Sequence, residues 1–105
     1  MYLENGWQQI EPTKGARDYR KAYKNKDNER VLELRLYENW QSWRLKVTVY
    51  TVNRGINIDY PIVYGCKLKT KDVGSMMNEA EDIARSFLTE LHSLIESAVD
   101  CLPDI

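Results

Sequence analysis

The stretch VLELRLYENWQSWRLKVTVYTV, residues 31–52, alternates apolar and polar side chains over most of its length. Apolar residues take every second position in two runs: Leu32, Leu34 and Leu36, then Trp43, Leu45, Val47 and Val49. Because successive strand side chains point to opposite faces, a period of two predicts two strands with one dry face and one wet face. Such one-sided burial is typical of an antiparallel sheet rather than a parallel sheet covered on both faces.

Segments on both sides of this pair extend the predicted sheet. Residues 38–42 fit a hairpin loop, and the sequence Asn-Arg-Gly at 53–55 fits a turn that needs a positive φ. The alternation resumes over residues 56–69, where Pro61 places the strand at an edge or marks a bulge, since proline cannot donate to a ladder. Residues 16–24 fit an exposed edge strand, and residues 1–15 fit an N-terminal arm or a short strand.

After the strands, apolar residues recur at intervals of three and four from Ser75 to Leu102. This spacing predicts an amphipathic helix. Ser75 is the expected N-cap, acids in the first two turns suit the helix dipole, and Pro103 ends the helix. The apolar stripe of this helix must be buried, and the dry face of the sheet is the surface that can cover it.

The sequence therefore predicts an α+β fold in a single domain, residues 1–105. A four- or five-stranded antiparallel meander occupies residues 16–70, and one long C-terminal helix, residues 75–102, packs on one face of it. A helix of 28 residues is about 42 Å long, whereas a ten-residue strand spans about 33 Å. We therefore expect the end of the helix to extend past the sheet and to expose an apolar interface, with a homodimer as one outcome. The residues of this interface are Leu91, Leu94, Ile95, Ala98 and Leu102.

Composition narrows the class of protein. The chain has 105 residues, of which 43% are apolar and 30% are charged, as in ordinary globular proteins. No apolar run approaches the ~18 residues of a membrane span, and the N-terminus lacks the features of a signal peptide. Cys66 and Cys101 show no framework spacing, which favours two reduced thiols. A cytoplasmic protein is the expectation.

The charge is distributed unevenly along the chain. Residues 1–71 hold 14 lysines and arginines against 8 acids, whereas residues 72–105 hold Arg85 alone against 8 acids. On the wet face of the predicted sheet, cations alternate with tyrosines, a pattern suited to single-stranded nucleic acid because cations follow the phosphates and bases stack on flat rings. The candidate binding residues are Arg35, Tyr37, Arg44, Lys46, Tyr50, Arg20 and Lys21. The partner would be single-stranded DNA or RNA.

Two other interpretations compete with nucleic-acid binding. Lysine, arginine, threonine and tyrosine also serve simply to keep an exposed sheet face soluble, and the sequence shows no named nucleic-acid-binding motif. Alternatively, the chain is a protein-interaction module, an adaptor or inhibitor that acts through the apolar helix end or through the acidic helix face. That acidic face comprises Glu79, Glu81, Asp82, Glu90, Glu96 and Asp100.

The sequence offers little support for catalysis. His92 is the only histidine and has no histidine or cysteine three or four residues away, so we expect no metal site. No nucleophile with an evident neighbouring base and no glycine-rich phosphate loop is visible. We therefore expect a non-enzymatic protein without a cofactor.

Overall fold

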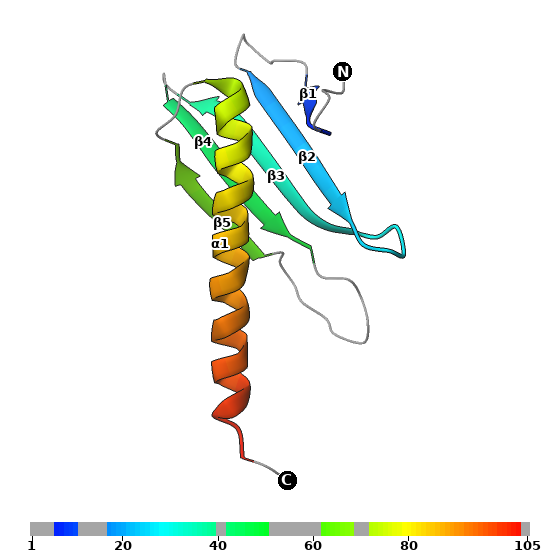
Figure 1. Cartoon of the computed structure of the whole chain (residues 1–105), viewed down its shortest axis with the longest axis vertical. Helices are drawn as coiled ribbons and strands as arrows, with labels where there is room; N and C mark the ends of the chain where they lie inside the picture. The colour runs from blue at the N-terminus through cyan, green and yellow to red at the C-terminus, as the bar shows by residue number, and fades with distance from the viewer. Residues whose placement is uncertain (1–5, 11–16, 40–41, 51–61, 69–71, 104–105) are drawn as a thin grey trace.

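The computed structural model describes residues 6–10, 17–39, 42–50, 62–68 and 72–103. Five strands form one antiparallel sheet in the order β1-β2-β3-β4-β5, so every strand pairs with its neighbour in the sequence (Figure 1). The strands are β1 (Gln8–Ile10), β2 (Asp18–Lys24), β3 (Arg30–Asn39), β4 (Ser42–Val49) and β5 (Ile62–Lys67). One helix, α1 (Val73–Asp100), follows the sheet and crosses one of its faces. The predicted α+β meander with a C-terminal helix is confirmed.

The register of β3 and β4 places the apolar residues of the two strands on the same face. Leu34 is paired with Val47 and Leu36 with Leu45. All four of these side chains are buried beneath α1. The period of two in the sequence therefore identifies the face of the sheet that the helix covers.

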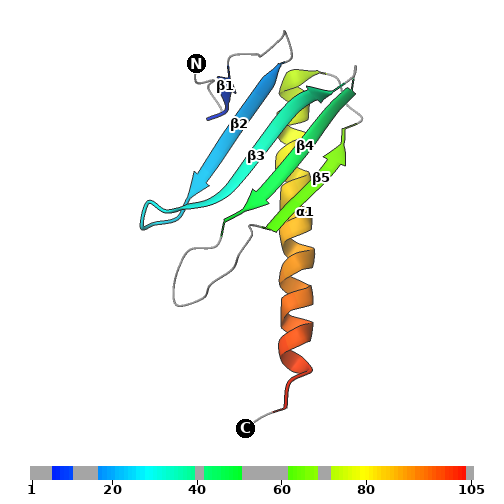
Figure 2. The ribbon, with the colours of Figure 1, turned by 180° about the vertical axis from the view of Figure 1, so that it is seen from behind.

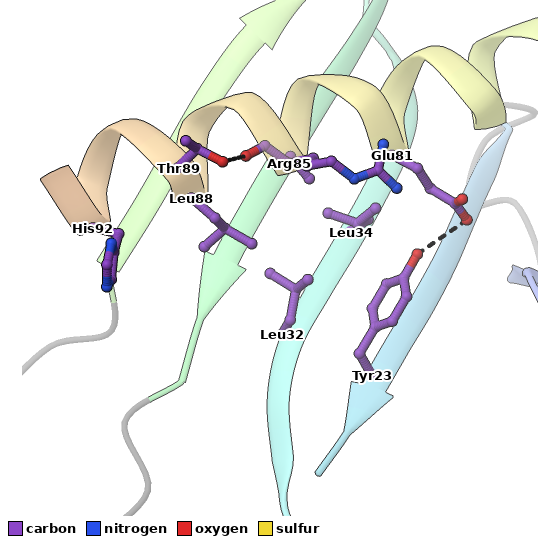
Figure 3. Close-up of a pocket in the computed structure, with 9 residues that line it drawn as sticks. Tyr23, Leu32, Leu34, Glu81, Arg85, Leu88, Thr89 and His92 are labelled. Atoms are coloured by element: carbon purple, nitrogen blue, oxygen red, sulfur yellow. Dashed lines mark hydrogen bonds between the residues drawn. The ribbon is translucent and has the colours of Figure 1, made fainter.

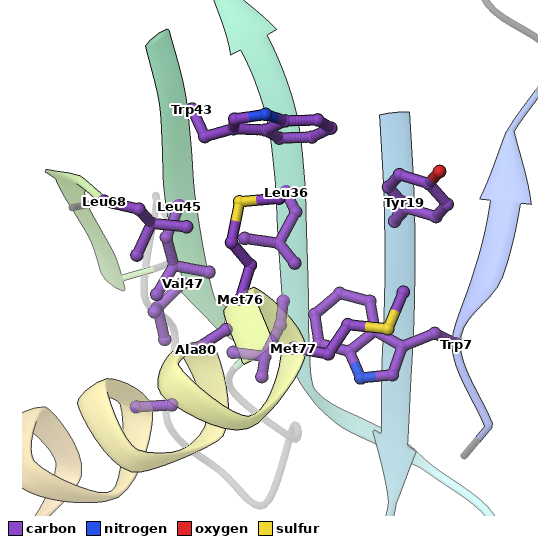
Figure 4. Close-up of a cluster of buried hydrophobic side chains, with 12 residues drawn as sticks. Trp7, Tyr19, Leu36, Trp43, Leu45, Val47, Leu68, Met76, Met77 and Ala80 are labelled. Atoms are coloured by element: carbon purple, nitrogen blue, oxygen red, sulfur yellow. The ribbon is translucent and has the colours of Figure 1, made fainter. Parts of the chain in front are cut away.

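The N-terminal half of α1 supplies the other side of the core. Met76, Met77, Ala80 and Ala84 are its buried residues, and Figure 4 shows the two methionines among the side chains of the sheet. The small side chains of Ala80 and Ala84 let the helix lie close to the strands. Trp7, just before β1, is fully buried in the same cluster, so the N-terminal arm contributes its indole to the core.

The start of α1 differs from the prediction. The N-cap is Asp72, whose carboxylate accepts hydrogen bonds from the backbone N–H of Ser75 at 3.0 Å and from its hydroxyl at 2.9 Å. Ser75 is therefore the third residue of the helix, and the prediction that it caps the helix was wrong. Both residue types are good caps, and an aspartate carboxylate here binds both donors of Ser75 at once. These hydrogen bonds lower the pKa of Asp72.

The C-terminal half of α1 extends beyond the sheet, as predicted (Figures 1 and 2). The molecule is 56 Å long, and its Cα radius of gyration of 16.1 Å exceeds the roughly 13 Å of a compact domain of this length. Large apolar side chains are exposed there: Leu94 is 67% exposed, Ile95 53%, Val99 61% and Leu102 68%. We call residues 91–102 the overhang.

Some predictions lie outside the described residues. They are the turn at 53–55, the strand segment at 56–61, the tip of the hairpin loop at 40–41 and most of the arm at 1–15. The residue range of β5 falls within the strand expected over 56–69. Within the described part of the chain, no helix has the length and apolar character needed to cross a membrane.

Candidate functional site

Figure 2 shows the sheet face opposite α1. The strand register places five of the seven predicted nucleic-acid-binding residues on this face. We call this surface the open face. Its residues lie in two cross-strand rows: Arg20, Arg35 and Lys46 in one row, and Tyr37, Arg44 and Lys67 in the other. Tyr50 follows β4, where its backbone N–H donates to the carbonyl of Val31 at 3.0 Å.

Two of the arginines on the open face share one neighbouring carboxylate, which offsets half of their charge. Asp18 Oδ2 accepts a hydrogen bond from Arg35 Nε at 3.1 Å and lies 3.0 Å from Arg35 Nη2. The same oxygen lies 3.4 Å from Arg20 Nη2. Arg20, Arg35 and Asp18 together therefore carry one net positive charge instead of two.

The two predicted stacking rings are already in contact with arginines. The guanidinium carbon of Arg35 lies 4.7 Å from the centroid of the Tyr37 ring, and that of Arg30 lies 5.9 Å from the centroid of the Tyr50 ring. Both distances are within the range of a cation–π contact. A base could stack on the covered side of either ring only after displacing the guanidinium.

Three cations on the open face differ from Arg20 and Arg35 in having no acidic partner within the described parts of the chain. Among the described residues, Arg44, Lys46 and Lys67 make no ion pair. Arg44 and Lys67 are direct ladder partners on β4 and β5, and Lys46 is two positions from Arg44 on the same strand. Lys46 and Lys67 are exposed, and Arg44 is half-buried. This triad is the most basic part of the open face that is not already neutralised.

Lys21 is not part of the open face. Its position on β2 lies between those of Tyr19 and Tyr23 on the helix side of the sheet, and its Nζ atom lies 2.8 Å from Glu81 Oε1. Its assignment to the basic track was therefore wrong, because strand alternation places Lys21 and Arg20 on opposite faces.

Glu81 is the acceptor that joins α1 to the sheet at this point. It accepts hydrogen bonds from Lys21 and from the hydroxyl of Tyr23, the latter at 3.0 Å. The hydrogen bond from Lys21, and to a smaller extent those from Tyr23 and Trp7, lower the pKa of Glu81. The pKa of Tyr23 is raised, first by burial of the phenol and second by its hydrogen bond to Glu81. Glu81 therefore faces the sheet and does not belong to the solvent-facing acidic surface that the sequence suggested.

A groove of about 440 Å³ lies between α1 and strands β2 and β3. Figure 3 shows Leu32, Leu34 and Leu88 pointing into it, with Tyr23 and Glu81 hydrogen-bonded at one end and His92 at the other. The groove ends where the overhang begins, so Leu88 continues the line of Leu91 and Ile95 along the helix. The apolar surface of the helix is therefore continuous from the core to the overhang.

The overhang contains all five residues predicted as a protein interface. Leu94, Ile95, Ala98 and Leu102 are exposed, and Leu91 is half-buried at the margin of the sheet. Val99 adds another large exposed side chain that the sequence analysis did not select, although its apolar character was visible. Glu90, Glu96 and Asp100 are also exposed on this part of the helix.

Among the described residues, no three histidine, cysteine or acidic side chains lie close enough together to share a metal ion. Cys66 and Cys101 are both free thiols. Comparisons with protein-family models, with curated proteins and with solved structures find no match for this chain.

Proposed function

We propose that this protein is a small non-enzymatic binding protein whose open face holds single-stranded DNA or RNA through its phosphates. The observation that supports this proposal is the triad of Arg44, Lys46 and Lys67, three cations without an ion-pair partner among the described residues. Phosphate contacts supply affinity without reading sequence, so binding is independent of base sequence. No cofactor is needed, and two free thiols suit the reducing environment of the cytoplasm.

On the open face, phosphate contacts contribute more to the expected binding affinity than base stacking does. Because guanidiniums cover one side of Tyr37 and Tyr50, base stacking contributes less than on an unobstructed aromatic platform. Asp18 likewise reduces what Arg20 and Arg35 can offer to a phosphate. The triad therefore carries most of the affinity.

The number of phosphate contacts can be measured from the salt dependence of binding. Three contacts predict that log K falls with log salt with a slope of about −2 for a single strand. In the variant Arg44→Gln/Lys46→Gln we expect weaker binding and a slope of about −0.7, because one contact remains. Fluorescence anisotropy with a labelled oligonucleotide at several salt concentrations measures both quantities.

Arg85→Gln is the matched control, because Arg85 is an exposed arginine on α1, on the opposite side of the sheet. Its slope should equal that of the unmodified protein. No binding at low salt, or equal slopes for the double variant and the control, would reject the proposed nucleic-acid interface.

A second candidate function rests on the overhang. Four large apolar side chains are each more than half exposed on a helix that extends past its own sheet, and such a surface is typical of a protein interface. We infer that the chain also acts as a protein-interaction module through this segment. A photo-crosslinking amino acid at position 95 should capture a protein, whereas the same group at position 93, where Ser93 is exposed, should capture none.

A further inference from the structure

The overhang carries a regular seam of apolar residues that its own sheet does not cover. Within the overhang, Leu91, Ile95, Ala98 and Leu102 follow one another at alternating intervals of four and three, and Leu88, which lines the groove, precedes Leu91 by three. This interval corresponds to the a and d positions of a heptad, the pattern by which two helices pack side by side. The seam continues the apolar stripe that α1 packs against the sheet. Near Leu91 this stripe passes the margin of the sheet and becomes exposed to solvent.

We propose that the overhang of one molecule pairs with the overhang of a second copy in the antiparallel sense. This inference rests on the second proposed function, that the overhang binds protein, and it is independent of nucleic-acid binding. The paired segments are residues 91–102 of each copy, and the sheets lie at opposite ends of the dimer.

The position of the sheet selects the antiparallel arrangement. The sheet occupies the seam side of α1 along its N-terminal half, where Met76, Ala80 and Ala84 are buried. A parallel partner would place its own N-terminal half along the same side, in the space that the sheet fills. Figure 1 shows the sheet at one end of α1, so an antiparallel partner would instead carry its own sheet past the far end of the overhang.

An antiparallel pair also fixes which residues meet. In the heptad, Ile95 and Leu102 occupy a positions, and Leu91 and Ala98 occupy d positions. In an antiparallel pair an a position faces a d position of the partner. Ile95 therefore lies against Ala98 of the second copy, and Leu91 lies against Leu102 of the second copy. The large Ile95 side chain then meets the small Ala98 side chain at the centre, a size match that helix packing favours. Since the arrangement is symmetric, each contact occurs twice.

The charges of the overhang permit a second copy even though the segment is acidic. The positions beside the seam are His92, Leu94, Val99 and Cys101, and none of them is a carboxylate. Glu90, Glu96 and Asp100 lie at outward positions. The C-terminal end of the partner helix carries the negative end of the helix dipole with no basic residue in its last turn, and it arrives beside His92, whose Nε2 lies 3.5 Å from Glu96 Oε1.

The first test is the molecular mass in solution. Sedimentation velocity should give a dimer whose dissociation constant is on the order of micromolar, since a short interface must also offset the cost of association. Ile95→Glu should raise the dissociation constant on the order of 100-fold or more, because it buries a charge in the seam. Ser93→Glu adds the same charge at an exposed outward position and should leave the dimer unchanged. Circular dichroism should show that both variants keep the fold.

The second test is the direction of pairing. In a background with Cys66→Ser and Cys101→Ser, a mixture of Leu91→Cys and Leu102→Cys chains of different length should form a disulfide between the two. Leu91→Cys alone should not cross-link. In the antiparallel pair the two Leu91 positions are separated by about 16 Å along the helix axis, which is too far for a disulfide. Cross-linking of Leu91→Cys with itself would show a parallel pair and would overturn the proposal.

A monomer at every concentration tested, or a dimer indifferent to Ile95→Glu, would also overturn the inference. The position-95 photo-crosslink separates this failure from that of the proposed interaction surface. A covalent adduct of twice the chain mass supports the second copy as the partner. An adduct with a different protein rejects self-pairing but keeps the interaction function, and the absence of any adduct rejects both.

Discussion

At the scale of single residues, Glu81 connects the helix to two other described segments, β2 and the residue Trp7 just before β1. It joins α1 to β2 through Lys21 and Tyr23, and the indole of Trp7 also lowers its pKa. Its side chain remains 33% exposed, so water screens part of these interactions. The contact holds the helix against β2, the strand between β1 and β3.

Replacing Glu81 should reveal this connection. At neutral pH, Glu81→Gln should lower the free energy of unfolding by about 1 kcal/mol, since hydrogen bonds to a charged acceptor are lost. Urea unfolding followed by tryptophan fluorescence measures the difference. Glu90→Gln, which changes an exposed acid on the same helix, is the control and should change the free energy of unfolding by less than about 0.5 kcal/mol.

The effect of Glu81→Gln should depend on pH in a defined direction. The fold lowers the pKa of Glu81, so its contribution to stability is complete above the unfolded value of about 4.3 and is lost as the pH falls through the lower folded value. The gap in unfolding free energy between the protein and the variant should therefore narrow below about pH 4. A gap that stays constant from pH 7 to pH 3 would mean that the carboxylate charge does not contribute.

At the scale of elements, the ring pair of Tyr64 and Phe87 links the edge strand β5 to α1. The two rings are stacked, with centroids 4.8 Å apart and planes 13° from parallel. They also border a second groove, of about 330 Å³, on the β5 side of the helix. This pair and the Glu81 contact hold the two sides of the helix, one through aromatic packing and the other through charge.

A double-mutant cycle should measure the contribution of the ring pair. For Tyr64→Ala and Phe87→Ala we expect a coupling free energy of about 0.5–1.5 kcal/mol, the usual range for an aromatic pair. The same cycle with Tyr64→Ala and Leu94→Ala should give a coupling near zero, because Leu94 lies on the exposed overhang. Equal coupling in both cycles would contradict a specific link between β5 and α1.

Periodicity predicted the elements well, because burial on one face repeats every two residues in a strand and every three to four in a helix. It placed Leu34, Leu36, Leu45 and Val47 in the core, and it identified the apolar end of the helix. Periodicity does not predict the side-chain contacts that join one element to another. The bonds of Asp18 with Arg35 and of Glu81 with Lys21 join residues 17 and 60 positions apart, and they depend on strand register and on the rotation of the helix.

Two predictions are wrong for different reasons. Grouping Lys21 with Arg20 by charge conflicts with the strand alternation, which places them on opposite faces. Ser75 was selected as the N-cap by its type, although Asp72 has an equally suitable side chain three positions earlier. For Lys21 the alternation alone excludes the open face, whereas for the N-cap the local preference allows both residues and the tertiary structure decides between them. Trp7 shows the same limit, since a single indole in a polar arm gives no periodic signal.

At the scale of the whole molecule, the helix has two halves in different surroundings. Residues from Met76 to Ala84 pack on the sheet, whereas residues from Leu94 to Leu102 have exposed side chains. An isolated helix of about a dozen residues is only marginally stable in water. The two halves should therefore open with different free energies even though they form one continuous helix.

Amide hydrogen exchange should separate the halves. At low protein concentration, amides from residues 94–100 should exchange at least about 100-fold faster than those of Ala80 and Ala84. Raising the concentration should slow exchange in residues 94–100 alone, because pairing with a second copy protects only the overhang. Equal protection along the helix at low concentration would show that the overhang is stabilised within one molecule.

The described residues of the sheet region and of the helix carry opposite net charge: the former hold ten lysines and arginines against five acids, and residues 72–103 hold one arginine against seven acids. The first 71 residues carry a net charge of +6 and the remaining 34 carry −7, so a net charge of −1 conceals two opposite surfaces. Binding to a charged matrix depends on the local surface that faces it, not on the total charge. Despite an isoelectric point near 5.8, the protein should be retained at neutral pH and low salt by both cation and anion exchangers. Arg44→Gln/Lys46→Gln should shorten retention on the cation exchanger only, which makes chromatography a direct measure of how the fold separates its charges.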